Sequence, residues 1–134
     1  MSKGNSGLFN GTSGDTEQLI LELEKRHEKF SKDDMVAITK TKDGKIVWLE
    51  KGHLGLRASG LIHIFQEHQR DFESAGIRAD EIVDYIMKAL QRGNRIGTQG
   101  RSRAVYEVEY NGKIRKVAIE IGSNGYIVSA NPRS

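Results

Sequence analysis

Apolar residues before Gly93 recur at the three- and four-residue spacing of amphipathic helices. The first such segment is predicted to begin at Asp15 or Thr16, and its apolar positions are Leu19, Ile20, Leu23 and the later Phe30. A second helix is predicted within SGLIHIFQEHQRDF (59–72). A third helix is predicted from Ala79 to Arg92, where Gly93 provides a C-cap.

Strand signals surround these helices. The segment MVAITKTKDGKIVWLEKG (35–52) predicts a β-hairpin with Asp43-Gly44 at its turn. After Gly93 the apolar period changes to two, and AVYEVEYNGKIRKVAIEI (104–121) predicts a hairpin with a type I′ turn at Asn111-Gly112. With strands also expected in NRIGTQ and YIVSANP, the chain should end in a meander of three or four antiparallel strands.

The separation of helices from strands predicts an α+β fold, in which N-terminal helices and a hairpin precede an antiparallel β-meander. Residues 1–14 have the Gly, Ser and Asn composition of a flexible linker or junction. Residues 15–134 are expected to form a single domain, because a chain of 134 residues can bury a normal core on its own.

Composition narrows the possible chemistry. The absence of cysteine excludes disulfides, thiolate zinc sites and a cysteine nucleophile. A formal net charge of +3 is a mild indication of an acidic partner such as nucleic acid, but a general surface excess of positive charge explains it better. No run of 18 apolar residues predicts a transmembrane helix, and no apolar segment of signal-peptide type is present near the N-terminus.

Two histidines stand five residues apart in the predicted helix 59–72. At 100° per residue they are separated by about 140°, so they are not expected to share a narrow face. His68 falls on the apolar face, which favours a core histidine hydrogen-bonded to backbone, whereas His63 favours a solvent-facing position. A zinc pair on one helix prefers a spacing of four. General acid–base catalysis is the functional alternative, because imidazole titrates near neutrality.

The segment QRGNRIGTQGRSRAVYEVEY (91–110) concentrates arginine and glycine, including Arg92, Arg95, Arg101 and Arg103. Arginine binds phosphate through paired N–H groups, and glycine lets the backbone approach an anion closely. The segment therefore predicts a phosphodiester-binding loop or, alternatively, a basic solvated connection. A metal-free ribonuclease site would form if histidine and arginine side chains were gathered on one sheet face with the strand residues Tyr106, Lys116 and Ser129.

Between Gly7 and Pro132 the chain contains, in this order, GLFNGTSG, VWLEKG, GLIHIFQEH, QGRSRAVYEVEYNGK and VAIEIGSNGYIVSANP. In this arrangement the chain resembles toxin domains at the C-termini of bacterial polymorphic toxins, in particular the toxin tip of contact-dependent growth inhibition proteins. The wider group resembles the barnase/EndoU/colicin/RelE-like ribonucleases, in which N-terminal helices precede a meander.

This resemblance implies an RNA-cleaving toxin, with tRNA as the expected substrate and no cofactor. It implies delivery from the surface of the producing cell, action in the target-cell cytoplasm and a cognate immunity protein. Some such toxins use elongation factor Tu of the target cell as a partner. Related domains match His63, His68, Arg103 and Tyr106, but their Gly-Thr-Gly-Arg-Pro run is not kept here. The loop hydroxyl is therefore either Thr98 or Ser102.

The leading hypothesis is a metal-independent endoribonuclease. His63 or His68 would act as general base or acid, and Arg103, with Arg101, would stabilise the charge on the phosphate. Tyr106 and Thr98 would position RNA or stabilise the same charge, and the further substrate-binding candidates are Arg92, Arg95, Lys116 and Ser129. The alternatives are a non-catalytic module that binds RNA or a translation factor, and a metal-dependent nuclease. An acidic immunity protein is expected to cover Arg92–Arg103.

Overall fold

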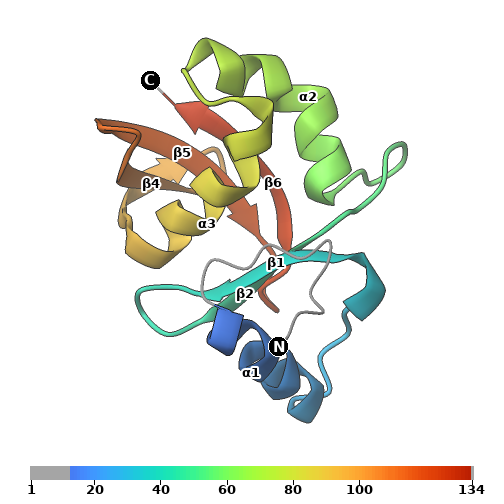
Figure 1. Cartoon of the computed structure of the whole chain (residues 1–134). Coiled ribbons are helices and arrows are strands. Elements are labelled where there is room, and N and C mark those ends of the chain that lie inside the picture. Colours follow the sequence, from blue (N-terminus) through green and yellow to red (C-terminus); the bar gives the residue numbers. More distant parts are fainter. Residues whose placement is uncertain (1–12, 134) are drawn as a thin grey trace.

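The computed structural model describes residues 13–133, which form an α+β domain with the helices and strands drawn in Figure 1. The helices are α1 (Ser13–Lys25), α2 (Gly60–Ser74) and α3 (Ile82–Arg92), with 3₁₀ turns η1 (Lys32–Asp34) and η2 (Ala79–Glu81). The strands are β1 (Met35–Lys40), β2 (Ile46–Glu50), β3 (Asn94–Gln99), β4 (Arg103–Tyr110), β5 (Lys113–Ile121) and β6 (Ile127–Arg133). None of these helices combines the length and apolarity needed to span a bilayer.

The predicted α+β class is confirmed, and the predicted helices are present with shifted ends. α1 begins earlier than predicted, at Ser13, and it ends at Lys25, so Phe30 lies beyond the helix. Phe30 still packs edge-on against Trp48, with ring centroids 6.3 Å apart. The first residues of the predicted third helix form η2. Residues 1–12 of the predicted linker lie outside the described range.

β1 and β2 form the predicted antiparallel hairpin, with Ile38 opposite Trp48. Thr41 N–H donates to Lys45 O at 2.8 Å, and Gly44 N–H donates to Thr41 O at 2.9 Å, which closes the turn. Gly44 has a φ of +92°, in the left-handed region that favours glycine. Most residues of both strands are buried, because the hairpin is covered on both of its faces. This burial explains why β2 is a continuous apolar run instead of an alternating one.

The predicted meander has four strands in the order β3-β4-β5-β6, and every neighbouring pair is antiparallel. Asn111 and Gly112 have φ values of +53° and +80°, so the predicted type I′ turn is confirmed. Helices α2 and α3 cover one face of this sheet (Figure 1). Tyr106 and Val117 are opposite each other on that face and contribute to the core beneath the helices.

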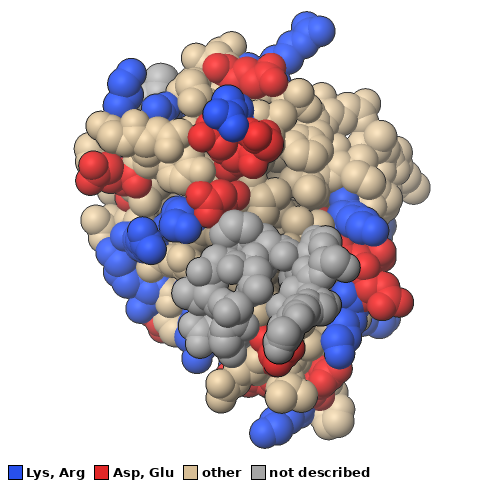
Figure 2. All heavy atoms as spheres, viewed as in Figure 1, with Lys and Arg blue, Asp and Glu red and all other residues tan. Residues whose placement is uncertain are grey.

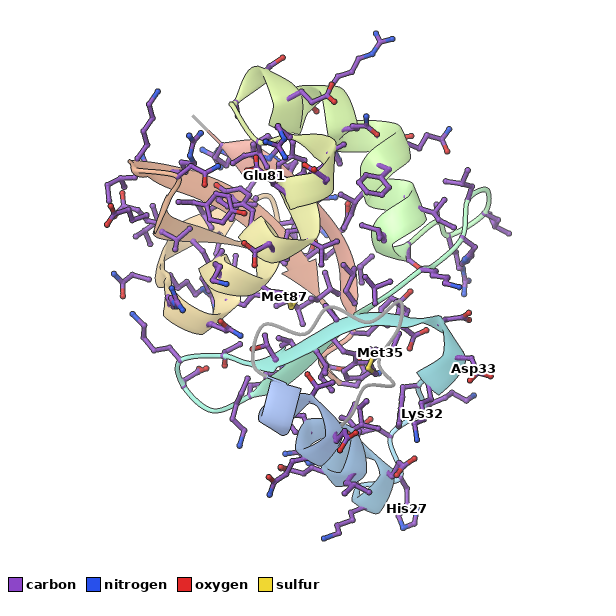
Figure 3. The ribbon with its side chains drawn as sticks, in the orientation of Figure 1. His27, Lys32, Asp33, Met35, Glu81 and Met87 are labelled. Carbon is purple, nitrogen blue, oxygen red and sulfur yellow. The ribbon has the colours of Figure 1, made fainter. Side chains whose placement is uncertain are left out.

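Two hydrophobic clusters lie on opposite faces of the β1–β2 hairpin. The larger cluster joins the hairpin to α2, α3 and the four-stranded sheet, and it includes Val47 and Met87. The smaller cluster joins the hairpin to α1 and includes Leu23, Met35 and Trp48. In Figure 3, Met87 and Met35 mark the two clusters on either side of the hairpin. The hairpin is therefore the central layer of the domain.

A close backbone contact joins strand β2 of the hairpin to the loop before β6. Trp48 N–H donates to Gly125 O at 3.0 Å, and Trp48 and Tyr126 form a parallel bridge. Gly125 has a φ of +109°, and a Cβ at this position would lie 2.4 Å from Ile46 O. The buried indole N–H of Trp48 donates to Glu50 Oε2 at 2.9 Å, so burial of the ring leaves no unpaired donor.

We expect Gly125→Ala to lower the free energy of unfolding by about 3 kcal/mol, because the added methyl group meets Ile46 O and the Trp48 ring. Gly112→Ala is the matched control, since Gly112 has a φ of +80° and nothing within 4 Å of an added Cβ. The control should lose only about 1 kcal/mol, the cost of the left-handed backbone. Chemical denaturation measures both values, and equal losses would show that the close approach does not matter.

Candidate functional site

A pocket of about 350 Å³, here called the basic pocket, lies between the turn of the β1–β2 hairpin and the β3–β4 part of the sheet. Its polar lining residues are Thr41, Asp43, Lys45, Arg95, Thr98, Arg101, Ser102, Arg103 and Tyr106. Five of the predicted site residues are thus brought together, namely Arg95, Thr98, Arg101, Arg103 and Tyr106. Figure 2 shows Lys and Arg side chains gathered on the left side of the molecule, where the hairpin turn lies in Figure 1.

The polar lining of the basic pocket comes from two distant segments of the chain. Residues 41–45 form the hairpin turn, and residues 95–106 run through β3 and the connection into β4. Gln91 Nε2 donates to Thr39 Oγ1 at 2.6 Å, which ties the end of α3 to β1. Lys42 Nζ donates to Asn94 Oδ1 at 2.7 Å, which ties the hairpin turn to the start of β3. These contacts hold the turn beside the sheet.

Cations dominate the described residues that line the basic pocket. Asp43 is the only carboxylate among them, and the lining cations are Lys45, Arg95, Arg101 and Arg103, of which Lys45 and Arg95 act electrostatically on Asp43. The Thr41 hydroxyl donates a hydrogen bond to Asp43, and Thr41 Oγ1 accepts one from Lys45 N–H at 3.0 Å. The excess of positive charge around one cavity favours an anionic ligand.

Two titratable groups in the basic pocket have shifted pKa values. The hydrogen bond from Thr41 lowers the pKa of Asp43 below its ordinary value of 3.8, and Lys45 and Arg95 act in the same direction. Burial raises the pKa of Tyr106 above its ordinary value of 10.0, although Arg95 opposes this shift. At neutral pH the pocket therefore contains an ionised carboxylate and a phenol that keeps its proton.

The arginines of the basic pocket differ in how they are held. Arg103 Nη1 donates to Asn131 Oδ1 at 2.6 Å, and Arg103 Nε lies 3.6 Å from Glu120 Oε1. Within residues 13–133, Arg95 and Arg101 are exposed and form no side-chain hydrogen bond or ion pair. Arg103 pairs with Glu120 across the sheet and is one residue out of phase with Tyr106 on the covered face, so its guanidinium is held on the opposite sheet face, whereas Arg95 and Arg101 keep their donors for a ligand.

The two helix histidines do not line the basic pocket. The ring centroids of His63 and His68 are 6.4 Å apart and the ring planes are at 85°, so the expected separation of the rings is wrong. His68 Nδ1 lies 3.1 Å from Asp71 Oδ2, so its partner is a carboxylate and not the backbone. Both histidines are half-buried, and the core side of α2 carries the fully buried Ile64 and Phe72 instead.

Three other predicted residues also lie outside the lining of the basic pocket. Arg92 is exposed at the end of α3. Lys116 and Ser129 pair with Glu107 and Glu120 on the sheet face that is not covered by α3. Ser129 is 1% exposed, and its Oγ has no hydrogen-bond partner among the described residues. Such burial argues against contact between Ser129 and a substrate.

Thr41, Asp43 and Lys45 join the site without any sequence signal that marks them as functional. A polar run such as TKTKDGK is typical of hairpin turns in general, and the turn itself is correctly predicted. The packing of the hairpin against the sheet is what brings these residues to Arg95 and Tyr106. That packing joins segments about 50 residues apart, which no local pattern encodes.

Within residues 13–133, no group of three or more His, Asp or Glu side chains is arranged to hold a metal ion. No protein-family model matches the chain, and no curated protein matches it. The fold and the site define an α+β domain with a basic surface pocket.

We expect Thr41→Val to raise the pKa of Asp43 towards its ordinary value of 3.8, because the variant lacks the hydroxyl that stabilises the carboxylate. Thr41→Ser keeps a hydroxyl and should keep the pKa low. NMR titration of the Asp43 carboxyl carbon measures both. The same pKa in Thr41→Val and in the unaltered protein would show that the hydrogen bond is absent in solution.

The lowered pKa of Asp43 also makes the free energy of unfolding depend on pH. A carboxylate whose pKa is lowered by folding adds stability above its ordinary pKa of 3.8, and this contribution is lost as the pH falls through the lowered value. The stability difference between Thr41→Val and Thr41→Ser should therefore contain a part that is present at neutral pH and disappears in acid.

Proposed function

We propose that this domain is an antibacterial toxin that acts as a metal-independent endoribonuclease on tRNA. The observation that carries the proposal is the convergence of four cations, one carboxylate and several hydroxyl groups on the basic pocket. Cleavage of RNA through its 2′-OH requires a bound phosphodiester, a proton acceptor and donors for the charge that develops on phosphorus-bound oxygen. The lining residues offer each of these groups, and the resemblance to ribonuclease toxins supports the same reaction.

Arg95 and Arg101 are assigned to the scissile phosphate. Both are exposed and have no side-chain partner among residues 13–133, so their paired N–H groups are free for phosphate oxygens. The guanidinium of Arg103 is held by Asn131 and Glu120 on the opposite face of the sheet, so Arg103 contributes to the positive charge of this region without being assigned to the phosphate. Because negative charge grows on the phosphoryl oxygens during attack, the N–H groups of Arg95 and Arg101 stabilise the transition state more than the bound substrate.

Asp43 and Tyr106 are assigned to proton transfer. Asp43 takes the proton from the 2′-OH while the 2′-oxygen forms its bond to phosphorus. The bond from phosphorus to the 5′-oxygen breaks, and Tyr106 donates its phenolic proton to the departing oxygen. At neutral pH Asp43 is ionised and Tyr106 is protonated, as these roles require, although both shifts move the pKa away from neutrality and so make Asp43 a weaker base and Tyr106 a weaker acid.

The histidine pair is a second location for the acid and base of the same reaction. Asp71 engages Nδ1 of His68, which leaves Nε2 for a substrate, and His63 lies beside it. A carboxylate that orients an imidazole in this way is a common support for a general base. If the reaction takes place in the basic pocket, arginine variants of the pocket should lose cleavage and histidine variants of α2 should keep it. If it takes place at α2, the reverse is expected, so one set of variants decides between the two locations.

The alternative function is a non-catalytic module that binds RNA or a translation factor through the same pocket. The observation that favours it is that no imidazole is among the described residues lining the basic pocket. Cationic side chains are sufficient for binding to an RNA backbone, and such binding weakens steeply as salt is added. Elongation factor Tu of the target cell is the translation factor that the resemblance suggests, with aminoacyl-tRNA as the RNA it presents.

As a toxin, the domain would be delivered from the surface of the producing cell and would act in the target-cell cytoplasm. The producing cell would need a cognate immunity protein. Arg92, Arg95 and Arg101 are exposed, and the formal net charge is +3, so we infer that this inhibitor is acidic and covers the basic pocket.

Brief expression in bacteria should produce discrete tRNA fragments on a blot, and Arg95→Ala and Arg101→Ala should each reduce cleavage about 100-fold. That size is typical for the loss of one donor that stabilises transition-state charge. The same variants, purified, should lose cleavage of tRNA in chelator-treated buffer to a similar extent. Arg70→Ala is the matched control, because it removes an exposed arginine of α2 outside the pocket lining.

His63→Ala and His68→Ala complete the same experiment. If fragments vanish in a histidine variant and persist in the arginine variants, the reaction takes place at α2 and not in the basic pocket. Growth arrest with intact RNA would support the binding module. Cleavage that requires added metal would overturn the metal-independent mechanism.

Hydrogen exchange should locate the immunity protein. We expect amides of 41–45 and 92–103 to be protected in the complex, because these segments carry the exposed charges of the basic pocket. Amides of α1, which does not line the pocket, serve as the internal control. Protection confined to α1 or α2 would show that the inhibitor acts without covering the pocket.

A further inference from the structure

A second cavity of about 280 Å³ adjoins the basic pocket. The two cavities share a wall formed by Thr41, Asp43, Arg95 and Tyr106. The second cavity, here called the side pocket, is completed by Lys42, Leu90, Gly93 and Asn94. It therefore lies between the hairpin turn, the end of α3 and the start of β3.

The side pocket differs in character from the basic pocket. Leu90 is 1% exposed and Gly93 is buried, so they form an apolar floor, and the half-buried Tyr106 adds an aromatic ring. Polar groups lie at the rim, where Lys42 Nζ donates to Asn94 Oδ1 at 2.7 Å. Because an ammonium group can only donate, this bond fixes the amide orientation and leaves Asn94 Nδ2 as a donor without a partner among the described residues.

We propose that the side pocket binds the nucleobase next to the phosphate that occupies the basic pocket. The proposal rests on phosphodiester binding in the basic pocket, as assigned in the proposed function. Unpaired RNA bases are recognised by stacking on aromatic rings or guanidinium planes and by hydrogen bonds to their edges. Tyr106 and Arg95 offer the stacking surfaces. Asn94 Nδ2 offers a donor to a base oxygen or ring nitrogen.

The shared wall places the proposed phosphate site next to the proposed nucleobase site. A nucleotide combines an anionic group with a planar aromatic ring, and the paired pockets combine a cationic cavity with a partly apolar one. Arg95 lines both, so its N–H groups can bind phosphate while its plane faces the base. Selectivity for a base would come from Asn94, because a site built to hydrogen-bond a ligand discriminates against ligands that leave its groups unpaired.

Binding of small ligands tests this inference without relying on catalysis. The probes are the four ribonucleoside 3′-monophosphates, ribose 5-phosphate and inorganic phosphate, titrated into the whole chain by NMR or calorimetry. At least one nucleotide should bind about tenfold more tightly than ribose 5-phosphate, as expected when a base stacks on an aromatic ring. Asn94→Asp keeps the acceptor for Lys42 but removes the donor, and it should lower that ratio, while the part that comes from stacking on Tyr106 remains.

Gln66→Ala, which removes an exposed amide on α2, is the control and should leave the ratio unchanged. Equal affinity for the nucleotides and for ribose 5-phosphate would overturn the base assignment, as would an unchanged ratio in Asn94→Asp. Cleavage of tRNA together with a ratio of one would overturn the side pocket alone. The expected ratio without any RNA cleavage would overturn the endoribonuclease alone, and failure of every probe to bind would overturn both.

Discussion

The hydrogen bond from Trp48 N–H to Gly125 O is the point on which the arrangement of this domain depends. It joins the edge of the β1–β2 hairpin to the start of β6, and it requires a backbone approach that only glycine permits at position 125. With this contact made, the hairpin is buried on both faces, and its turn is carried to the β3–β4 part of the sheet. The basic pocket is therefore a product of tertiary packing.

Rigid support behind a surface site matters because anion binding is sensitive to where donors are placed. The hairpin is held on one side by α1 through Trp48 and Leu23, and on the other by the core beneath α3. Gln91 and Lys42 add hydrogen bonds at the end nearest the pocket. The same supports shape the side pocket, so a change in the hairpin is expected to disturb both cavities together.

Most of the fold can be predicted from the sequence, because its signals are local. Asn111-Gly112 specifies its turn through the left-handed backbone it allows, and the change of apolar period near Gly93 separates helix from sheet. The site is only partly predictable. The arginine-rich segment identifies one wall, but the opposite wall, with Asp43, depends on long-range packing. The placement of His63 and His68 fails for another reason: angular spacing ignores side-chain rotamers, which bring the two rings into contact.

The arginines of the basic pocket differ in whether their side chains have hydrogen-bond partners. This difference argues for a ligand that is both anionic and extended. Arg103 is fixed by Asn131 and Glu120 on the opposite sheet face, so its guanidinium is not available to adjust to a ligand. Arg95 and Arg101 are free to adjust, which suits a polymer whose phosphates arrive in more than one geometry. A site for a small, compact anion gains most from donors that are all preorganised. Two adaptable cations are better matched to an extended anion, and Asp43 beside them keeps the pocket from binding every anion equally.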